Sequence, residues 1–133
     1  MKKIFFGVAL AAYSTAFSLE PPCTLTPNSE GVYEVSNYEQ LKVVPRCPLD
    51  GTYRLMADID ASASATQNCV DEGVCEGFTP IGDYYKPFTG LFDGNGHVIS
   101  GLWIQKSSSI AVGFIGKNEG NIQSLGLENG LAF

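Results

Sequence analysis

The C-terminal third of the chain repeats itself with a period of 23 residues. Residues 88–110 and 111–133 align as two copies in which glycines, asparagines and apolar residues coincide. A fixed period of about 20 to 50 residues is typical of units that bury their apolar faces by stacking on their neighbours. The repeat therefore predicts a solenoid. The coincident pairs are Gly90 with Gly113, Leu91 with Phe114, Phe92 with Ile115, Asn95 with Asn118, Ile99 with Ile122, Leu102 with Leu125, and Ile104 with Leu127.

The type of residue in each copy predicts strands rather than helices. Each copy lacks apolar spacing of helix length and is rich in β-branched and aromatic residues interrupted by glycine. The run Asp93–Gly96 is typical of a turn, because glycine and asparagine tolerate positive φ. We expect Ile99, Leu102 and Ile104 to face inward, with a bend at Ser100 and Gly101 that resets the alternation. Equivalent strands of successive coils should then pair in parallel, about 4.8 Å apart.

The same residues resemble a known family. FTGLFDGNGHVISGLWI, followed by VGFIGKNEGNIQSLGLEN, is similar to the GLUG motif repeats of bacterial secreted and surface proteins. Upstream, GVYEVSNYEQL, YRLMADIDAS and FTPIG stand in the order usually seen ahead of the first such repeat. The resemblance implies an all-β, right-handed parallel β-helix carried outside the cytoplasm, often within a long adhesin-like protein. Some relatives add a zinc peptidase domain, whose two-histidine motif cannot be formed here because His97 is the one histidine.

The N-terminus predicts export. Lys2 and Lys3 form a positive start, residues 4–12 an apolar stretch, and Ala16 with Ser18 a small-residue cleavage pattern. We interpret residues 1–18 as a signal peptide cleaved after Ser18, with cleavage after Ala16 as the competing site. A membrane anchor is the alternative, but the apolar run is shorter than the roughly 18 residues of a spanning helix. We expect an extracellular, cell-surface or periplasmic protein without a membrane span.

The charge of the chain disfavours nucleic acids and anionic membranes as partners. The chain has eight basic and fourteen acidic side chains, and loss of residues 1–18 removes two lysines and no acids. Six basic against fourteen acidic groups leave a formal charge of minus eight. Recognition of phosphate requires lysine and arginine to neutralise it. The acidity is also what the solubility of an exposed solenoid requires.

Four cysteines in an exported chain predict two disulfides, for which three pairings exist. We predict Cys23 with Cys47 and Cys69 with Cys75; the second pair closes the short acidic loop NCVDEGVC. A zinc site made by the four thiolates is the alternative. Neither pair has the two-to-four-residue spacing of a zinc knuckle.

Residues 19–87 are interpreted as a capping region ahead of the two coils of residues 88–133. A short strand is predicted over Val32–Val35, and Ser36 with Glu39 resembles the capping box of a helix of about two turns that ends before Pro45. This helix should cover the N-terminal end of the solenoid. Tyr53–Ile59 reads as a further strand and residues 61–76 as a loop.

The chain stops where the second copy ends, without a polar segment that would close the array. Solenoids need about three repeats and a closing cap. The sequence therefore predicts a truncated array, the N-terminal fragment of a longer protein, that self-associates through its exposed last coil.

Function is predicted to be non-catalytic, as an adhesion-type surface module without a cofactor or metal. Trp103 should point outward between Leu102 and Ile104, and Tyr84 and Tyr85 lie in a loop before the first copy. Exposed aromatic rings can stack on carbohydrate or anchor a host or surface protein. The alternative is that Trp103 packs beneath residues 61–76 and that the tyrosines cover the end of the solenoid.

A polysaccharide lyase or glycosidase is the alternative function, together with the repeat region of a secreted peptidase. Such an enzyme requires carboxylates, or a carboxylate and a base, close together on one face. The repeat does not supply them, since Asp93 aligns with Gly116 and His97 with Gly120. Asp58 and Asp60 could share one side of a strand, although solvation of a turn is the simpler interpretation.

A calcium loop is likewise disfavoured. Asp93 and Asn95 match only the beginning of such a loop, and the further oxygen ligands and late glutamate that calcium requires do not follow. We interpret residues 93–96 as a turn without metal.

Overall fold

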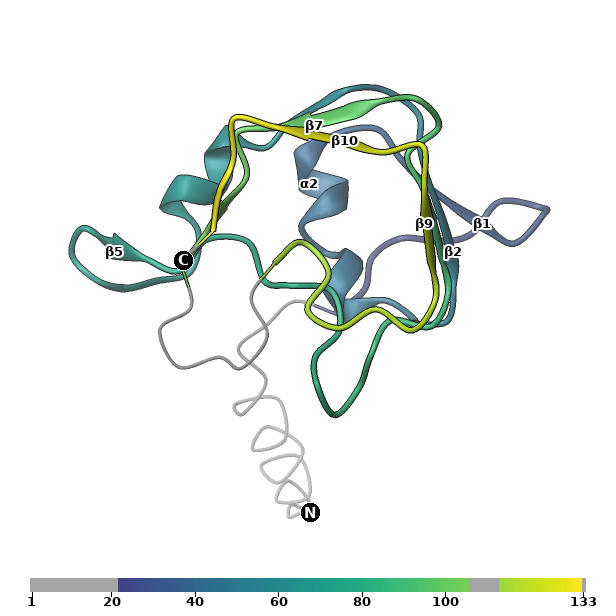
Figure 1. Ribbon diagram of the computed structural model, residues 1–133, viewed down its shortest axis with the longest axis horizontal. Coiled ribbons are helices and arrows are strands. Elements are labelled where there is room, and N and C mark those ends of the chain that lie inside the picture. Colours follow the sequence, from purple (N-terminus) through teal and green to yellow (C-terminus); the bar gives the residue numbers. More distant parts are fainter. Residues whose placement is uncertain (1–21, 106–112, 133) are drawn as a thin grey trace, which may run out of the picture.

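A computed structural model describes residues 22–105 and 113–132 of the chain. The predicted signal peptide and residues 106–112 lie outside the described residues. The described part is mainly β, with strands of two to four residues and little helix. Figure 1 shows the chain running repeatedly around one ring, so that segments distant in sequence lie over one another.

The largest sheet contains four strands, all paired in parallel in the order β1–β2–β6–β9. Its register places Tyr33, Tyr53, Phe92 and Ile122 in one column that crosses all four strands. The rings of Tyr33 and Tyr53 stack with centroids 4.9 Å apart, and Tyr53 stacks on Phe92 at 6.3 Å. The strands are β1 (Val32–Val35), β2 (Thr52–Leu55), β6 (Leu91–Asp93) and β9 (Asn121–Gln123).

Two smaller sheets are also parallel, and each pairs strands from successive turns of the chain. Strand β7 (Val98–Ser100) lies between β3 (Ile59–Asp60) and β10 (Gly126–Glu128), with Ile59, Ile99 and Leu127 in one column. Strand β8 (Trp103–Ile104) pairs with β11 (Leu131–Ala132). The predicted parallel pairing of successive turns is therefore present between these strands.

The predicted inward side chains are confirmed, but the predicted register is wrong. Ile99, Leu102 and Ile104 are buried. Ile99 pairs with Leu127 rather than Ile122, and Ile122 lies opposite Phe92. The reason is that the turns differ in length and none of these is 23 residues long: Ile122 lies 30 positions after its partner Phe92, Leu127 lies 28 after Ile99, and Phe92 lies 39 after Tyr53. An alignment at one fixed period cannot follow such a change.

Glycines mark the position at which successive turns approach most closely. A β-carbon on Gly90 would lie 2.0 Å from the carbonyl oxygen of Gly51, and one on Gly120 would lie 2.2 Å from that of Gly90. The backbones of three turns therefore touch through a glycine column, Gly51–Gly90–Gly120. The sequence alignment had placed Gly90 over Gly113 instead. Gly113 leads into Phe114, which is buried against the rings of Phe92 and Phe78.

A short helix lies across one end of the stack, but its four residues make about one turn rather than the two turns predicted. Helix α2 (Tyr38–Leu41) lies within the outline of the ring in Figure 1, and Tyr38 and Leu41 belong to the buried core. The predicted capping box is displaced by one residue, because Asn37 rather than Ser36 caps the helix and accepts a hydrogen bond from Gln40 N–H at 2.9 Å. The Gln40 side chain in turn accepts from Ser36 N–H at 2.7 Å. Pro45 lies in a 3-10 turn, η2 (Val44–Arg46).

Two segments ahead of the first copy, residues 53–59 and 61–76, differ from the prediction. The strand predicted over Tyr53–Ile59 is interrupted between β2 and β3. Residues 61–76, predicted as a loop, instead contain a 3-10 helix, η3 (Ser62–Thr66), and an antiparallel hairpin of β4 (Cys69–Asp71) and β5 (Val74–Cys75). The predicted disulfide between Cys69 and Cys75 joins the two strands of this hairpin. The hairpin projects from the ring in Figure 1.

Both predicted disulfides are confirmed: Cys23 is bonded to Cys47 and Cys69 to Cys75. The first ties the chain ahead of β1 to the residue that follows η2. Among the described residues, none of the helices has the length and apolar character needed to cross a bilayer.

We expect the aromatic column to dominate stability. Phe92 is fully buried, so Phe92→Ala should lower the free energy of unfolding by about 3 to 5 kcal/mol. Its register partner Ile122 is 41% exposed, and Ile122→Ala should cost less than about 2 kcal/mol. Urea unfolding of the disulfide-bonded protein measures both. Equal costs would contradict the assignment of Phe92 to the core and Ile122 to the open end.

Candidate functional site

The loop of residues 82–87 presents the largest exposed aromatic surface among the described residues. Tyr84 is 57% and Tyr85 84% exposed, and their rings meet edge to face with centroids 5.3 Å apart. Burying an exposed apolar ring is favourable. A contiguous pair of exposed aromatic rings is therefore a candidate for contact with a ligand. The structure thus brings together the two tyrosines that the sequence singled out.

Hydrogen bonds within the loop fix its backbone. The Asp83 carboxylate accepts from the N–H groups of Tyr85 and Lys86, each at 2.8 Å, and the Asp83 N–H donates to the Lys86 carbonyl at 2.9 Å. An aspartate at the start of a turn typically makes such bonds to the backbone that follows. Asp83 therefore fixes the backbone conformation of the loop.

The ends of the loop are hydrogen-bonded to the following turn of chain. Ile81 bridges Ile115, and Phe88 bridges Asn118, both in parallel. From this neighbouring turn, the Lys117 ammonium lies 4.7 Å from the centroid of the Tyr84 ring, a cation–π contact. Lys117 also forms an ion pair with Glu119 at 3.4 Å.

Trp103 does not join the tyrosines. Its indole N–H donates to the Cys75 carbonyl at 3.2 Å, and its backbone N–H donates to Ser64 Oγ at 2.8 Å. The carbonyl of Trp103 also accepts from Phe78 N–H. Trp103 is half-buried between the buried Leu102 and Ile104, and these contacts support the alternative that it packs against residues 61–76 rather than standing free for a ligand. The hairpin that carries Cys75 covers the strand position that alternation alone would leave open.

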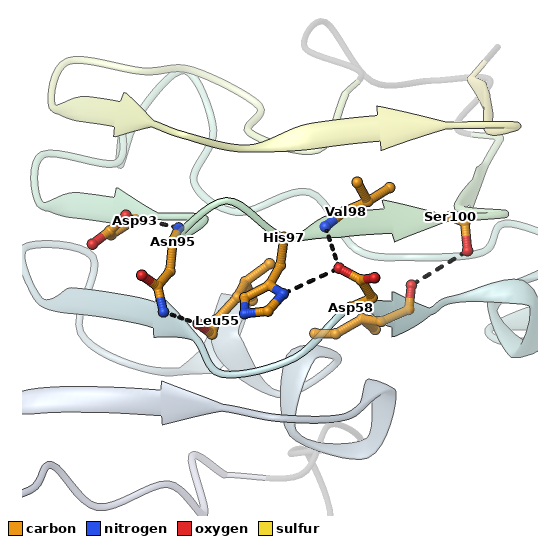
Figure 2. A network of polar contacts seen from close by, with 8 residues as sticks. Leu55, Asp58, Asp93, Asn95, His97, Val98 and Ser100 are labelled. Atoms are coloured by element: carbon orange, nitrogen blue, oxygen red, sulfur yellow. Dashed lines mark hydrogen bonds and ion pairs between the residues drawn. The ribbon is translucent and has the colours of Figure 1, made fainter.

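A second group of polar residues gathers where the corner between β6 and β7 lies over the segment between β2 and β3. Figure 2 shows Asp58 of the lower turn reaching His97 and Val98 of the upper one. Asp58 Oδ1 lies 3.1 Å from His97 Nδ1 and accepts from Val98 N–H at 3.0 Å. The Asn95 side chain donates to the Leu55 carbonyl at 3.1 Å. Each contact joins one turn to the next, which is a structural role.

These contacts bias the ionisation of the carboxylates. The hydrogen bond from Val98 N–H, together with the contact to His97, lowers the pKa of Asp58. The backbone N–H of Ser62 likewise lowers the pKa of Asp60 by hydrogen bonding. Both carboxylates are thus held in the charged form, unlike a general acid, whose pKa is typically raised.

Charged residues on the adjacent strands are also paired. Arg54 Nε of β2 lies 3.4 Å from Asp93 Oδ2 of β6, one turn away. Asp93 also accepts from Asn95 N–H at 2.8 Å, which closes the turn that the sequence predicted at this position. Among the described residues, no three of the His, Cys, Asp and Glu side chains are placed to hold a metal ion.

Sequence reasoning missed the pairings that cross from one turn to the next. Asp58 and His97 are 39 residues apart, and Lys117 lies well beyond the loop that it contacts. No local pattern connects such residues. The number of residues in each complete turn would have been the necessary signal, because it decides which residues lie over one another.

No family model and no solved structure matches this chain. Halomucin from Haloquadratum walsbyi is 36% identical over 107 residues, an alignment that spans 75% of this chain and 1% of halomucin. The chain therefore corresponds to a very small part of that relative. The two disulfides are typical of proteins in oxidising compartments outside the cytosol.

The Asp58 contacts predict a pH dependence of stability. Because the pKa of Asp58 is lower in the folded state than in the unfolded chain, its contribution is present above about pH 4 and is lost as the pH falls through the lower, folded pKa. The free energy of unfolding should therefore fall less steeply below pH 4 in Asp58→Asn than in the wild type. Glu72→Gln, in the turn of the β4–β5 hairpin, removes the same charge as a control. Identical acid slopes for wild type and Asp58→Asn would refute the stabilising role.

Proposed function

We propose that the chain is an exported, non-catalytic β-solenoid module that acts at or beyond the cell surface, and that its fold is a right-handed parallel β-helix. The observation that carries this proposal is the parallel pairing of successive turns in three separate sheets. When the strands of successive turns run in the same three directions, the turns stack into a rod with an extended outer surface. Resemblance to GLUG repeats supports the same architecture.

Similarity to halomucin and the two disulfides support the location of the module. Disulfides persist in oxidising compartments and are rare in the cytosol. The predicted signal peptide of residues 1–18 would provide the route of export. We place the recognition surface at the Tyr84–Tyr85 loop, whose exposed rings suit carbohydrate or a surface protein.

The absence of catalysis is proposed from the use that the chain makes of its polar groups. Asp58, His97, Arg54 and Asp93 are all engaged in contacts between turns. Hydrolysis of glycosidic bonds requires one carboxylic acid with a raised pKa beside a second carboxylate. The lowered pKa of Asp58 argues against that role.

A polysaccharide assay distinguishes the module from the alternative enzyme. We expect the protein to co-sediment with at least one insoluble polysaccharide or surface preparation and to release no reducing or unsaturated sugar ends from neutral or acidic polymers. Asp58→Asn serves as the matched variant, and its binding should equal that of the wild type. Sugar release that disappears in Asp58→Asn would replace the module with a lyase or glycosidase.

Self-association of the 133-residue chain is a second proposal, supported by its last described turn. Ile122, Leu127 and Leu131 are 41, 55 and 52% exposed along the outer strands β9, β10 and β11. Beside them is a hollow of about 390 Å³, lined by apolar side chains that include Leu102 and Phe114. Open strand edges with apolar side chains favour pairing with another chain. Since α2 covers the other end, we expect a second copy to bind at this end.

Sedimentation velocity at increasing concentration tests the association. The wild type should show a mass that rises with concentration, whereas Leu127→Lys with Leu131→Lys should remain a monomer, because buried unpaired charges are costly. Val70→Lys with Val74→Lys, at exposed positions on the hairpin, provides the control and should associate like the wild type. A wild type that stays monomeric at every concentration would overturn this proposal.

A further inference from the structure

We propose that the loop of residues 82–87 binds a neutral sugar, which stacks on Tyr85, and that Lys117 acts as a positioning residue by holding Tyr84. This inference rests on the proposed function, since it supplies the class of ligand for the aromatic loop of the module. It adds a residue that no sequence pattern connected with the loop.

The first observation is that the loop is ordered before any ligand arrives. Its inner turn is closed by the Asp83 carboxylate and by the bond between Asp83 N–H and the Lys86 carbonyl. Its two ends are joined to the next turn: Ile81 N–H donates to the Phe114 carbonyl, and Phe88 N–H donates to the Lys117 carbonyl, both at 2.9 Å. A preorganised loop loses little conformational entropy on binding.

The second observation is the unequal environment of the two rings. Tyr84 has the Lys117 ammonium near its ring and the ring of Tyr85 at its side. Tyr85 is 84% exposed, so most of its aromatic surface remains available. A tyrosine ring offers an apolar body and a polar hydroxyl, which match the C–H face and hydroxyl groups of a sugar. Lys117 therefore fixes Tyr84, and Tyr84 in turn orients Tyr85.

The third observation concerns charge. Two lysines, Lys86 and Lys117, lie at the loop together with two acids, Asp83 and Glu119, so the site has no net formal charge. Lys117 is already engaged by Glu119 and the Tyr84 ring. An anionic polymer would also approach a chain whose formal charge is −6. These features favour a neutral sugar over a uronate or a sulfated glycan.

Titration of the full chain with defined oligosaccharides tests the ligand class. The probes are neutral hexasaccharides of glucose and of N-acetylglucosamine, with hexagalacturonate as the anionic counterpart, at two salt concentrations. We expect at least one neutral probe to bind with a Kd that does not change with salt, and hexagalacturonate to bind more weakly. Tyr85→Ala should raise the Kd about tenfold, whereas Tyr85→Phe should change it less than about threefold.

The positioning role of Lys117 has its own variants. Lys117→Met should raise the Kd for the neutral probe several-fold, and Lys117→Arg should restore it, because arginine also makes cation–π contacts. Val70→Ala, an exposed apolar residue on the hairpin, is the matched control and should bind like the wild type. Unchanged unfolding midpoints will show that each variant is folded.

Three results would overturn the inference: a Kd unaffected by Tyr85→Ala, binding confined to the anionic probe, or no binding of any hexasaccharide. If the protein still co-sediments with a polymer or surface preparation without turnover, the ligand class is wrong while the proposed function stands. Binding only to a protein on that surface would have the same meaning. An unaffected Kd in Lys117→Met would remove the positioning role alone.

Discussion

Close contact between the backbones of successive turns is the constraint on which the rest of the structure depends. In the Gly51–Gly90–Gly120 column, a β-carbon on Gly90 or Gly120 would fall 2.0 or 2.2 Å from the carbonyl oxygen of the glycine in the preceding turn. Glycine at these three positions allows β2, β6 and β9 to begin in step with one another. The hydrogen-bonded register then places each aromatic ring of the adjacent column on the next one. A side chain in the glycine column would separate the turns and weaken both interactions at once.

Stacking also explains where polar chemistry is found. The corners between strands carry short polar side chains that satisfy backbone groups of the neighbouring turn, as Asn95 does for Leu55 and Asp58 does for Val98. These groups hold successive turns together. Longer insertions, such as the loop that carries Tyr84 and the β4–β5 hairpin, project from the ring. The corner contacts therefore contribute to stability, and our proposal assigns recognition to the insertions.

The two insertions differ in an instructive way. The hairpin folds back so that its Cys75 carbonyl accepts a hydrogen bond from the indole N–H of Trp103, and the tryptophan is half-buried. The tyrosine loop instead stays open, although its ends are hydrogen-bonded to the next turn. Tyr53 in the core differs from the exposed Tyr85. Burial raises the pKa of Tyr53, and its hydroxyl donates a hydrogen bond to the Pro48 carbonyl. Tyr85 has no comparable enclosure.

The sequence by itself determined the features that depend on neighbours a few residues away. Alternation and glycine bends predicted the inward Ile99, Leu102 and Ile104, and cysteine spacing together with export predicted both disulfides. Only the tertiary structure decided the pairing of Ile99 with Leu127, the contact of Asp58 with His97, and the position of Lys117 beside Tyr84. The physical reason is that register between turns is set by the number of residues in each turn, loops included, and by side-chain packing across the stack. Both concern contacts between residues that are distant in the chain, and a fixed repeat length does not describe them.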